Sequence, residues 1–189
     1  MTQNSGAHLM NYKLRLIEAL ANAMIADGVP SYQQLLFYVA AMFKPNVMVE
    51  LGVYRGQTTI QLAEGNPEGQ VYGVDLRMDN VKQARIHRRY NITLVEEDSL
   101  KAVDQIPPAD LIFFDSLHRY NHLMAEYEVY SAKARPGCLL FFDDIEKCNE
   151  PGIGDFTEEM KQAWEDIPIE KILLPNMNEF HGFGVAVVE

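Results

Sequence analysis

The segment 46–59, with the sequence NVMVELGVYRGQTT, restricts the fold of this chain more than any other segment. A short apolar run of Val47, Met48, Val49 and Leu51 contains β-branched residues and ends at Gly52, a pattern that predicts a buried parallel strand. Gly52 and Gly56 permit a tight turn with positive φ, and the residues after them begin a helix whose first N–H groups have no intrahelical partner. This succession of strand, glycine turn and helix N-terminus predicts a polar or anionic ligand at the turn.

The spacing of the glycines narrows the kind of ligand. Glu50, Gly52 and Gly56 form the pattern E-x-G-x-x-x-G, whereas a dinucleotide-binding loop follows G-x-G-x-x-G. The incomplete pyrophosphate cradle disfavours a nucleotide-linked oxidoreductase. The pattern resembles motif I of class I methyltransferases that use S-adenosylmethionine (SAM), a ligand with an amino acid end and a ribose but no phosphate. Similar turns occur in other α/β proteins, so the rest of the chain has to support this interpretation.

Four further apolar runs predict strands over 71–74, 92–95, 109–114 and 138–142. The first of these runs ends at Asp75, which follows Gly52 by 75 − 52 = 23 residues. In Rossmann-like folds an acidic residue about 20 residues after the loop accepts hydrogen bonds from the ribose hydroxyls. Asp79 is available to cap the helix predicted over 80–90, which leaves Asp75 free as the ribose ligand.

The last two predicted strands, 167–174 and 182–188, are joined by residues 175–181 alone, which is too short for a parallel crossover. These two strands therefore pair antiparallel. A terminal antiparallel pair resembles the methyltransferase sheet order 3-2-1-4-5-7-6, whereas an NAD-binding domain ends with a parallel sixth strand. We expect an α/β fold, a Rossmann-like doubly wound sheet of five parallel strands plus a C-terminal antiparallel hairpin, with two N-terminal helices.

The two N-terminal helices are predicted from apolar residues at helical spacing before Gly28 and from a capping box of Ser31 and Gln34. Other helices are predicted over 100–103, 123–133 and 153–164. A chain of 189 residues has the usual size of one folded domain. We expect residues 1–45 to form a helical extension packed on the core and residues 46–189 to form the SAM-dependent methyltransferase domain. The extension completes the core, covers the substrate side or forms a dimer contact, and its residues do not decide between these roles.

Three carboxylates follow the fourth and fifth predicted strands, namely Asp115, Asp143 and Asp144. The carboxyl ends of neighbouring parallel strands meet at one edge of a sheet, beside the ligand crevice. Carboxylates that converge there without a basic partner raise at least one pKa among them, unless a divalent cation lies between them. Oxygen ligands favour Mg²⁺, with Mn²⁺ or Ca²⁺ as substitutes, and argue against zinc. The alternative for the Asp143–Asp144 pair is loop solvation or helix capping.

The segments IFFDSLHRY, RPGCLLFFDDI and PGIGDF resemble the metal-dependent small-molecule O-methyltransferases of the catechol-type and antibiotic-sugar branch. The resemblance implies that Asp115, Asp143 and Asp144 hold the metal. It also implies that Asp115 and His118 are the catalytic residues, with His118 as the general base. An imidazole with an unperturbed pKa of about 6.5 can accept a hydroxyl proton at neutral pH. A single loop histidine can instead be a surface residue or a residue that packs against adenine.

The resemblance further implies a set of contacts with SAM. The implied SAM-binding residues are Glu50, Gly52, Tyr54, Gly56, Thr58, Asp75, Asp98, Ser99 and Asp115. Asp98 and Ser99 belong to the adenine side, although either can equally be the N-cap of the helix predicted over 100–103. Thr58 binds the SAM carboxylate at a helix N-terminus, where the helix dipole favours negative charge. Arg55 departs from the family pattern, and it points to solvent or reaches an acidic substrate.

The function implied by these residues is methyl transfer from SAM to a hydroxyl oxygen of a small molecule, assisted by a divalent metal. The acceptor is a sugar, a catechol or a related diol, and nothing in the sequence distinguishes these compounds. The alternative is a catalytically silent SAM-binding sensor or a partner subunit. Such a protein binds SAM tightly but shows neither metal dependence nor turnover.

The composition limits the possible partners and the compartment. Lys and Arg number 16 against 27 Asp and Glu, and the resulting net charge of −11 opposes binding to a phosphate backbone. No apolar run approaches the ~20 residues of a membrane span, and the N-terminal residues lack the pattern of a signal peptide. Cys138 and Cys148 have no metal-ligand spacing and are expected to be reduced thiols. We expect a cytoplasmic protein that binds neither nucleic acid nor membrane, and a homo-oligomer is compatible with the sequence.

Overall fold

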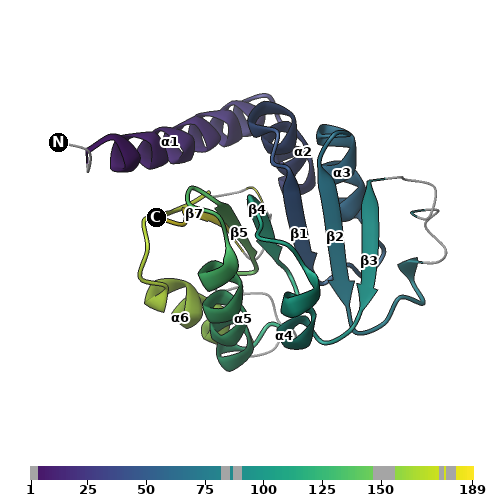
Figure 1. The fold of residues 1–189 in the computed structure, drawn as a ribbon. Helices are drawn as coiled ribbons and strands as arrows, with labels where there is room; N and C mark the ends of the chain where they lie inside the picture. The colour runs from purple at the N-terminus through teal and green to yellow at the C-terminus, as the bar shows by residue number, and fades with distance from the viewer. Residues whose placement is uncertain (1–3, 82–85, 87–90, 147–155, 175–176, 178–181) are drawn as a thin grey trace.

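The fold is built on one mixed sheet of seven strands in the order β3-β2-β1-β4-β5-β7-β6 (Figure 1). This computed structural model describes residues 4–81, 86, 91–146, 156–174, 177 and 182–189. The strands are β1 (Val47–Leu51), β2 (Gln70–Asp75), β3 (Ile92–Glu96), β4 (Leu111–Phe114), β5 (Leu139–Asp143), β6 (Lys171–Leu173) and β7 (Phe183–Val187). The observed order confirms the predicted sheet order.

The strand pairing brings several strand ends to one edge of the sheet. β1 pairs parallel with β2 and β4, β2 with β3, and β4 with β5. Leu51 at the end of β1 lies opposite Val74 of β2 and Phe114 of β4. β7 runs antiparallel to both β5 and β6, which confirms the predicted C-terminal hairpin. The residues that follow β1, β2 and β4 are therefore neighbours in space.

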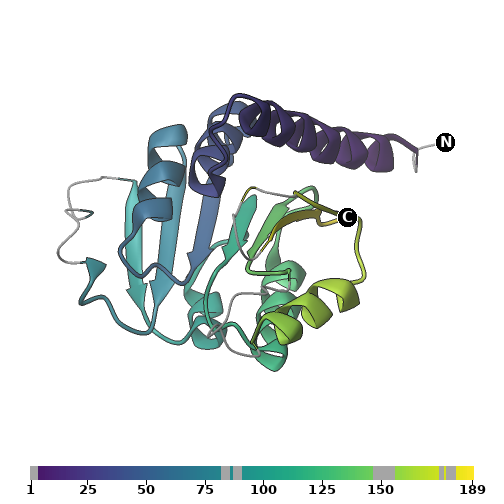
Figure 2. The same cartoon turned by 180° about the vertical axis from the view of Figure 1, so that it is seen from behind.

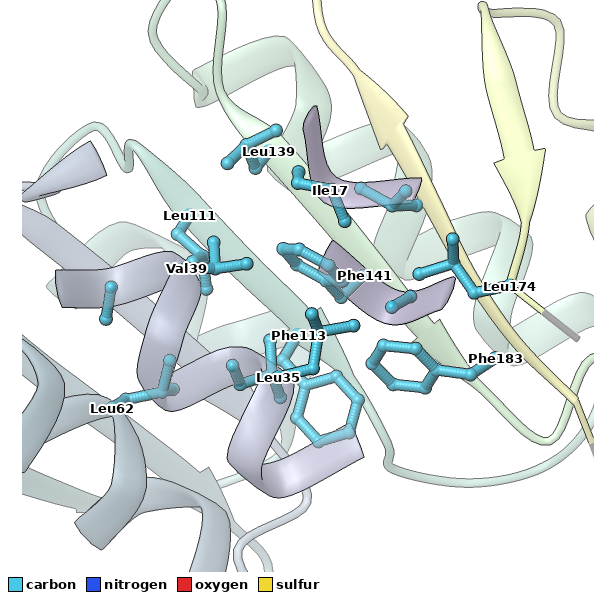
Figure 3. Packing of buried hydrophobic residues seen from close by; sticks show 14 of the residues in the cluster. Ile17, Leu35, Val39, Leu62, Leu111, Phe113, Leu139, Phe141, Leu174 and Phe183 are labelled. Atoms are coloured by element: carbon cyan, nitrogen blue, oxygen red, sulfur yellow. The ribbon is translucent and has the colours of Figure 1, made fainter. Parts of the chain in front are cut away.

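Helices cover both faces of the sheet (Figures 1 and 2). One layer contains α1 (Asn4–Ala26), α2 (Tyr32–Phe43) and α3 (Gln57–Gly65), and the other contains α4 (Ser99–Ala102), α5 (Tyr120–Lys133) and α6 (Phe156–Asp166). Because side chains alternate along a strand, Phe113 and Phe141 pack under the first layer, whereas Phe114 and Phe142 pack under the second. Figure 3 shows the first of these two cores, with Leu35 of α2 beside Phe113.

The N-terminal helices are part of the first core. Ser31 is the N-cap of α2, since its Oγ accepts a hydrogen bond from the Gln34 N–H at 3.3 Å, as the capping box predicts. Ile17 of α1 packs in the same hydrophobic cluster as Phe141 of β5. The division into residues 1–45 and 46–189 stays a prediction. Within the described ranges, no helix has both the length and the apolar character that a membrane crossing requires.

The main difference from the predicted elements concerns β6, which covers Lys171–Leu173 rather than the whole of 167–174. Pro168 has no N–H to donate to a neighbouring strand. The Nζ of Lys171 donates to the carbonyl groups of Trp164 and Ile167, so this segment is held at the end of α6. The helices predicted over 80–90 and 153–164, the connection 175–181 and Cys148 lie wholly or partly outside the described residues.

Candidate active site

A cavity of about 600 Å³ lies at the carboxyl edge of the sheet, where β1, β2 and β4 end. This volume is within the range of about 300–1,000 Å³ that is typical of small-molecule sites. Many of the predicted site residues line the cavity, namely Glu50, Gly52, Tyr54, Thr58, Asp75, Asp98, Ser99, Asp115 and His118. Gly56, Asp143 and Asp144, which the structure also describes, lie outside its wall.

The turn after β1 lies directly against the end of β4. Gly52 has a φ of +92°, and a Cβ atom at this position would lie 1.9 Å from the carbonyl oxygen of Asp115. Glycine is needed here because no other residue allows such an approach. Gly56 also has a positive φ, but its missing side chain makes room for Ile86. The structure thus brings the predicted SAM loop against the predicted catalytic segment and gives Gly56 a role in packing.

Asp75 is fixed at the cavity wall by backbone donors. Its Oδ2 accepts the N–H groups of Val53 at 3.0 Å and Tyr54 at 2.8 Å, and its Oδ1 accepts the N–H of Arg77 at 3.0 Å. A carboxylate has about four lone-pair sites, so three backbone donors leave capacity for a further hydrogen bond. Asp75 therefore orders the glycine loop and still presents an acceptor to a bound hydroxyl group.

Glu50 and Thr58 lie on the buried side of the loop. Glu50 is only 2% exposed and accepts a hydrogen bond from the hydroxyl of Thr59. Burial raises the pKa of Glu50 well above its usual value, although the hydrogen bond from Thr59 opposes this shift. Thr58 is in the first turn of α3, where unpaired N–H groups and the helix dipole favour an anionic group such as a carboxylate.

Asp98 and Ser99 line the cavity after β3. The Oδ1 of Asp98 accepts the Leu100 N–H at 2.9 Å, so Asp98 is the N-cap of α4. The sequence left open whether Asp98 caps this helix or faces a ligand, and the structure places the capping residue in the cavity wall. The Oγ of Ser99 lies 3.3 Å from Nε2 of His122, a residue of α5 that also lines the cavity.

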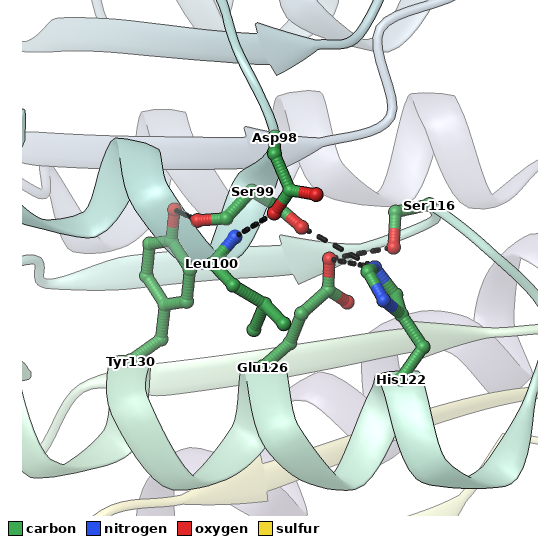
Figure 4. Close-up of polar contacts among 7 residues, drawn as sticks. All are labelled: Asp98, Ser99, Leu100, Ser116, His122, Glu126 and Tyr130. Carbon is green, nitrogen blue, oxygen red and sulfur yellow. Dashed lines mark hydrogen bonds and ion pairs between the residues drawn. The ribbon is translucent and has the colours of Figure 1, made fainter.

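One face of α5 connects the segments that follow β3 and β4 (Figure 4). Glu126 Oε1 accepts a hydrogen bond from Ser116 Oγ at 2.7 Å and lies 3.0 Å from Nε2 of His122. The hydroxyl of Tyr130 donates to the carbonyl of Ser99 at 2.8 Å. The hydrogen bond with Glu126 raises the pKa of His122, although partial burial opposes the shift. The sequence analysis did not identify this network, because residues at i and i+4 on a helix are more typical of a solvent-exposed pair.

His118 lies between two carboxylates. Its Nε2 is 3.4 Å from Asp115 Oδ1 and 3.3 Å from Asp144 Oδ2. Burial lowers the pKa of His118, but the hydrogen bond with Asp115 and the charges of the nearby aspartates outweigh burial, so the pKa is raised. Burial also raises the pKa of Asp115, although the contact with His118 partly offsets this shift. The carboxylates around His118 therefore favour the protonated form of its imidazole.

The predicted metal ligands are brought together only in part. Asp115 and Asp144 converge on His118, and Asp143 is buried at the end of β5. Among the residues that the structure describes, no group of three or more His, Cys, Asp and Glu side chains is arranged to hold a metal ion. The carboxylates offer the oxygen ligands that a hard cation prefers, but the His118 imidazole lies between two of them. The metal site therefore stays a prediction.

The first turn of α2 also contributes to the cavity, which the sequence analysis did not predict. Tyr32 and Gln33 line the wall together with Asp115. The Tyr32 ring stacks on Phe183, with centroids 5.3 Å apart, and lies tilted against Phe113 at 5.9 Å. Burial, and after it the charges of four nearby carboxylates, raise the pKa of Tyr32, so its hydroxyl keeps its proton and can donate it in a hydrogen bond. A tyrosine directly after an N-cap serine gives no sequence signal for such a position.

Comparison with known protein families gives a match over the part of the chain that forms the cavity. The methyltransferase domain family matches residues 49–145, just over half of the 189-residue chain. This segment contains all the predicted SAM contacts, and the match confirms the resemblance to methyltransferases. A comparison with curated protein sequences finds no match.

Solved structures of low sequence identity share the fold. Cofactor-bound Rv0187 from MTB has a TM-score of 0.71 at 20% identity, with 83% of this chain and 79% of that chain covered. The O-methyltransferase TomG from Streptomyces achromogenes, which is involved in tomaymycin synthesis and is in complex with SAM, has a TM-score of 0.67 at 17% identity, with 100% and 99% covered. The O-methyltransferase from Bacillus cereus in complex with SAH has a TM-score of 0.64 at 19% identity, with 94% and 91% covered.

Proposed function

Because the chain belongs to the methyltransferase domain family, we propose that it transfers a methyl group from SAM to a hydroxyl oxygen of a small molecule. The observation that carries this proposal is one cavity whose wall contains both the glycine loop with Asp75 and the pair of His118 and Asp115. The fold shared with the O-methyltransferases TomG and that of Bacillus cereus supports oxygen as the acceptor atom.

The order of the strands gives the proposed orientation of the donor. Its adenine lies at the end of β3 near Ser99, its ribose at the end of β2 at Asp75, and its methionine portion at the end of β1 near Thr58. β4 is the next strand in the sheet, so the sulfonium methyl points toward Asp115 and His118. Donor binding and methyl transfer are thus assigned to different strand ends of the same cavity.

The proposed chemical step uses the imidazole of His118. Asp115 and Asp144 keep a proton on Nε2, which leaves the lone pair of Nδ1 to accept the proton of the acceptor hydroxyl. The hydroxyl oxygen attacks the methyl group in line with the breaking C–S bond. A C–O bond forms, the C–S electron pair stays on sulfur, and the product is neutral S-adenosylhomocysteine. Since the pKa of His118 is raised, its neutral form, which a general base requires, is favoured toward alkaline pH.

We propose a sugar, a catechol or a related diol as the acceptor, in agreement with the sequence resemblance. A divalent cation at Asp115, Asp143 and Asp144 would lower the pKa of the acceptor hydroxyl when bound. Because His118 lies between two of these carboxylates, the mechanism above assigns no step to a metal. Turnover of metal-stripped protein with and without Mg²⁺ tests the metal separately, and activity that is insensitive to chelation would count against it.

The direct test is calorimetric titration of SAM and of NAD, followed by turnover assays on sugars, catechols and diols. We expect SAM to bind, NAD not to bind, and methylated product to appear with at least one class of acceptor. His118→Asn is expected to retain SAM binding and to lose most of the turnover, because it removes the base but not the donor contacts. SAM binding without turnover on any acceptor would support the silent sensor or partner subunit, and failure to bind SAM would overturn the proposal.

A further inference from the structure

Behind the cavity wall, α5 carries a carboxylate that the proposed chemical step does not use. Glu126 is 1% exposed and lies behind Ser116 and His122, two residues that do line the cavity. Removal of a carboxylate from water is costly, and an apolar side chain of similar size in its place is often neutral or stabilising. Core packing alone therefore does not account for a glutamate at this position.

The contacts of Glu126 lead to two separate parts of the wall. It accepts a hydrogen bond from Ser116 Oγ at 2.7 Å and lies 3.0 Å from Nε2 of His122, which in turn is 3.3 Å from Oγ of Ser99 (Figure 4). Ser116 follows β4, and Ser99 begins α4 shortly after β3. The hydrogen bond from Tyr130 to the carbonyl of Ser99 provides a second connection from the same face of α5.

These connections matter because β3 and β4 are not neighbours in the sheet. β2 and β1 lie between them, so no direct pairing between β3 and β4 holds together the segments that carry Ser99 and Ser116. A flat aromatic ligand bound between the two segments requires a fixed spacing. A site left unsupported by a second layer of contacts loses affinity through displacements of about 1 Å.

We propose that Glu126 is a positioning residue that fixes the adenine end of the donor site, and that His122 contacts the adenine ring as part of the wall. Through Ser116 and His122, the glutamate sets the spacing between the segments after β4 and β3. This inference rests on the proposed function, since it takes SAM as the ligand. It assigns no chemical step to either residue, because the reacting methyl group lies at the Asp115 end of the cavity.

The test compares Glu126→Gln with Glu128→Gln, the same substitution at an exposed position of the same helix. For Glu126→Gln we expect the Kd of S-adenosylhomocysteine to rise about tenfold, because a neutral amide replaces the carboxylate that holds His122 and accepts the hydrogen bond of Ser116. The Kd of adenosine, which lacks the methionine portion, should rise by the same factor. The KM for SAM should rise in parallel, while kcat at saturating SAM and the KM for the acceptor change less than about twofold. Glu128→Gln should leave all five values unchanged.

A general loosening of the fold would change kcat and the acceptor KM as well. A loss of donor affinity with kcat and the acceptor KM unchanged therefore separates positioning from a purely structural role. An unchanged Kd for S-adenosylhomocysteine in Glu126→Gln, with normal binding by the wild type, overturns this inference and leaves the proposed function intact. Failure of the wild type to bind the ligand instead overturns the proposed function. If thermal melting shows that Glu126→Gln does not fold, His122→Gln decides: a tenfold weaker binding of adenosine supports the inference, and equal binding overturns it.

Discussion

Asp75 and Asp115 are carboxylates in the wall of one cavity, but they have different partners. Asp75 accepts backbone N–H groups of the glycine loop, whereas Asp115 lies 3.4 Å from Nε2 of His118. We predict that Asp75→Ala raises the Kd of SAM about tenfold or more, because a ribose acceptor and the support of the loop are both lost. Asp115→Asn should lower kcat by about 100-fold and change the Kd of SAM by less than about threefold. Calorimetry and steady-state kinetics measure both effects, and equal losses of affinity and kcat in each variant would contradict these roles.

The pair of His122 and Glu126 should also make the stability of the protein depend on pH. The pKa of His122 is raised above 6.5 by Glu126 and, more weakly, by the charge of Asp98, so the folded state binds this proton more tightly than the unfolded state. The resulting stabilisation is fully present below about pH 6.5 and is lost as the pH rises through the raised pKa.

We therefore expect the free energy of unfolding of the wild type, measured with urea, to decrease across this pH range more steeply than that of Glu126→Gln. His118 contributes a dependence of the same sign, since its pKa is also raised. Because His118 is present in both proteins, the difference between them isolates His122. Parallel pH profiles for the two proteins would show that Glu126 does not hold the proton on His122.

At the scale of elements, α2 places the side chain of Tyr32 in the wall of the cavity that also contains Asp115. The Tyr32 ring packs on Phe183 and Phe113, and its hydroxyl keeps its proton because burial and nearby carboxylates raise its pKa. We predict that Tyr32→Phe folds normally and binds SAM as the wild type does, but has a KM for the acceptor about fivefold to tenfold higher because one hydrogen-bond donor is lost. Tyr38→Phe, at an exposed position of α2, is the control. An unchanged acceptor KM in Tyr32→Phe would remove this helix from the acceptor site.

The elements that the sequence predicts best are those whose burial is complete. β1, β4 and β5 are buried along their whole length, so β4 and β5 appear as uninterrupted apolar runs that end at an aspartate, and β1 appears as an apolar run interrupted only by Glu50. Glu126 was not predicted, because its burial depends on how α5 docks against the strand ends and not on its own sequence neighbours. The predicted start of β6 at residue 167 was wrong for a similar reason, since Lys171 is held by carbonyl groups at the end of α6 and the strand begins only there.

At the scale of the whole molecule, the sequence predicted which strand ends meet but not how their side chains share the space. The sheet order places Asp115 and Asp144 directly after the adjacent strands β4 and β5, as the sequence implied. The metal site was inferred from three carboxylates that repel one another without a cation. In the structure His118 lies between two of them, and a protonated imidazole offsets the same repulsion. Periodicity cannot distinguish these two arrangements, because both have the same residues at the same strand ends.

The cavity wall combines residues from α2, from α5 and from the ends of β1 to β4, so a ligand that fills the cavity connects elements from both layers of the fold. Such a ligand should stabilise the entire domain. At about 100 times its Kd, a ligand that binds only the folded state adds about 2.7 kcal/mol, which corresponds to a rise of roughly 5–10 °C in Tm for a domain of this size. We predict this shift for S-adenosylhomocysteine in a thermal melt and no shift for NAD at the same concentration. Glu126→Gln should show the full shift only when the ligand concentration is raised about tenfold, because its cavity is complete but its affinity is lower. A shift with NAD and none with S-adenosylhomocysteine would reassign the cavity to a nucleotide cofactor and remove the premise of the proposed methyl transfer.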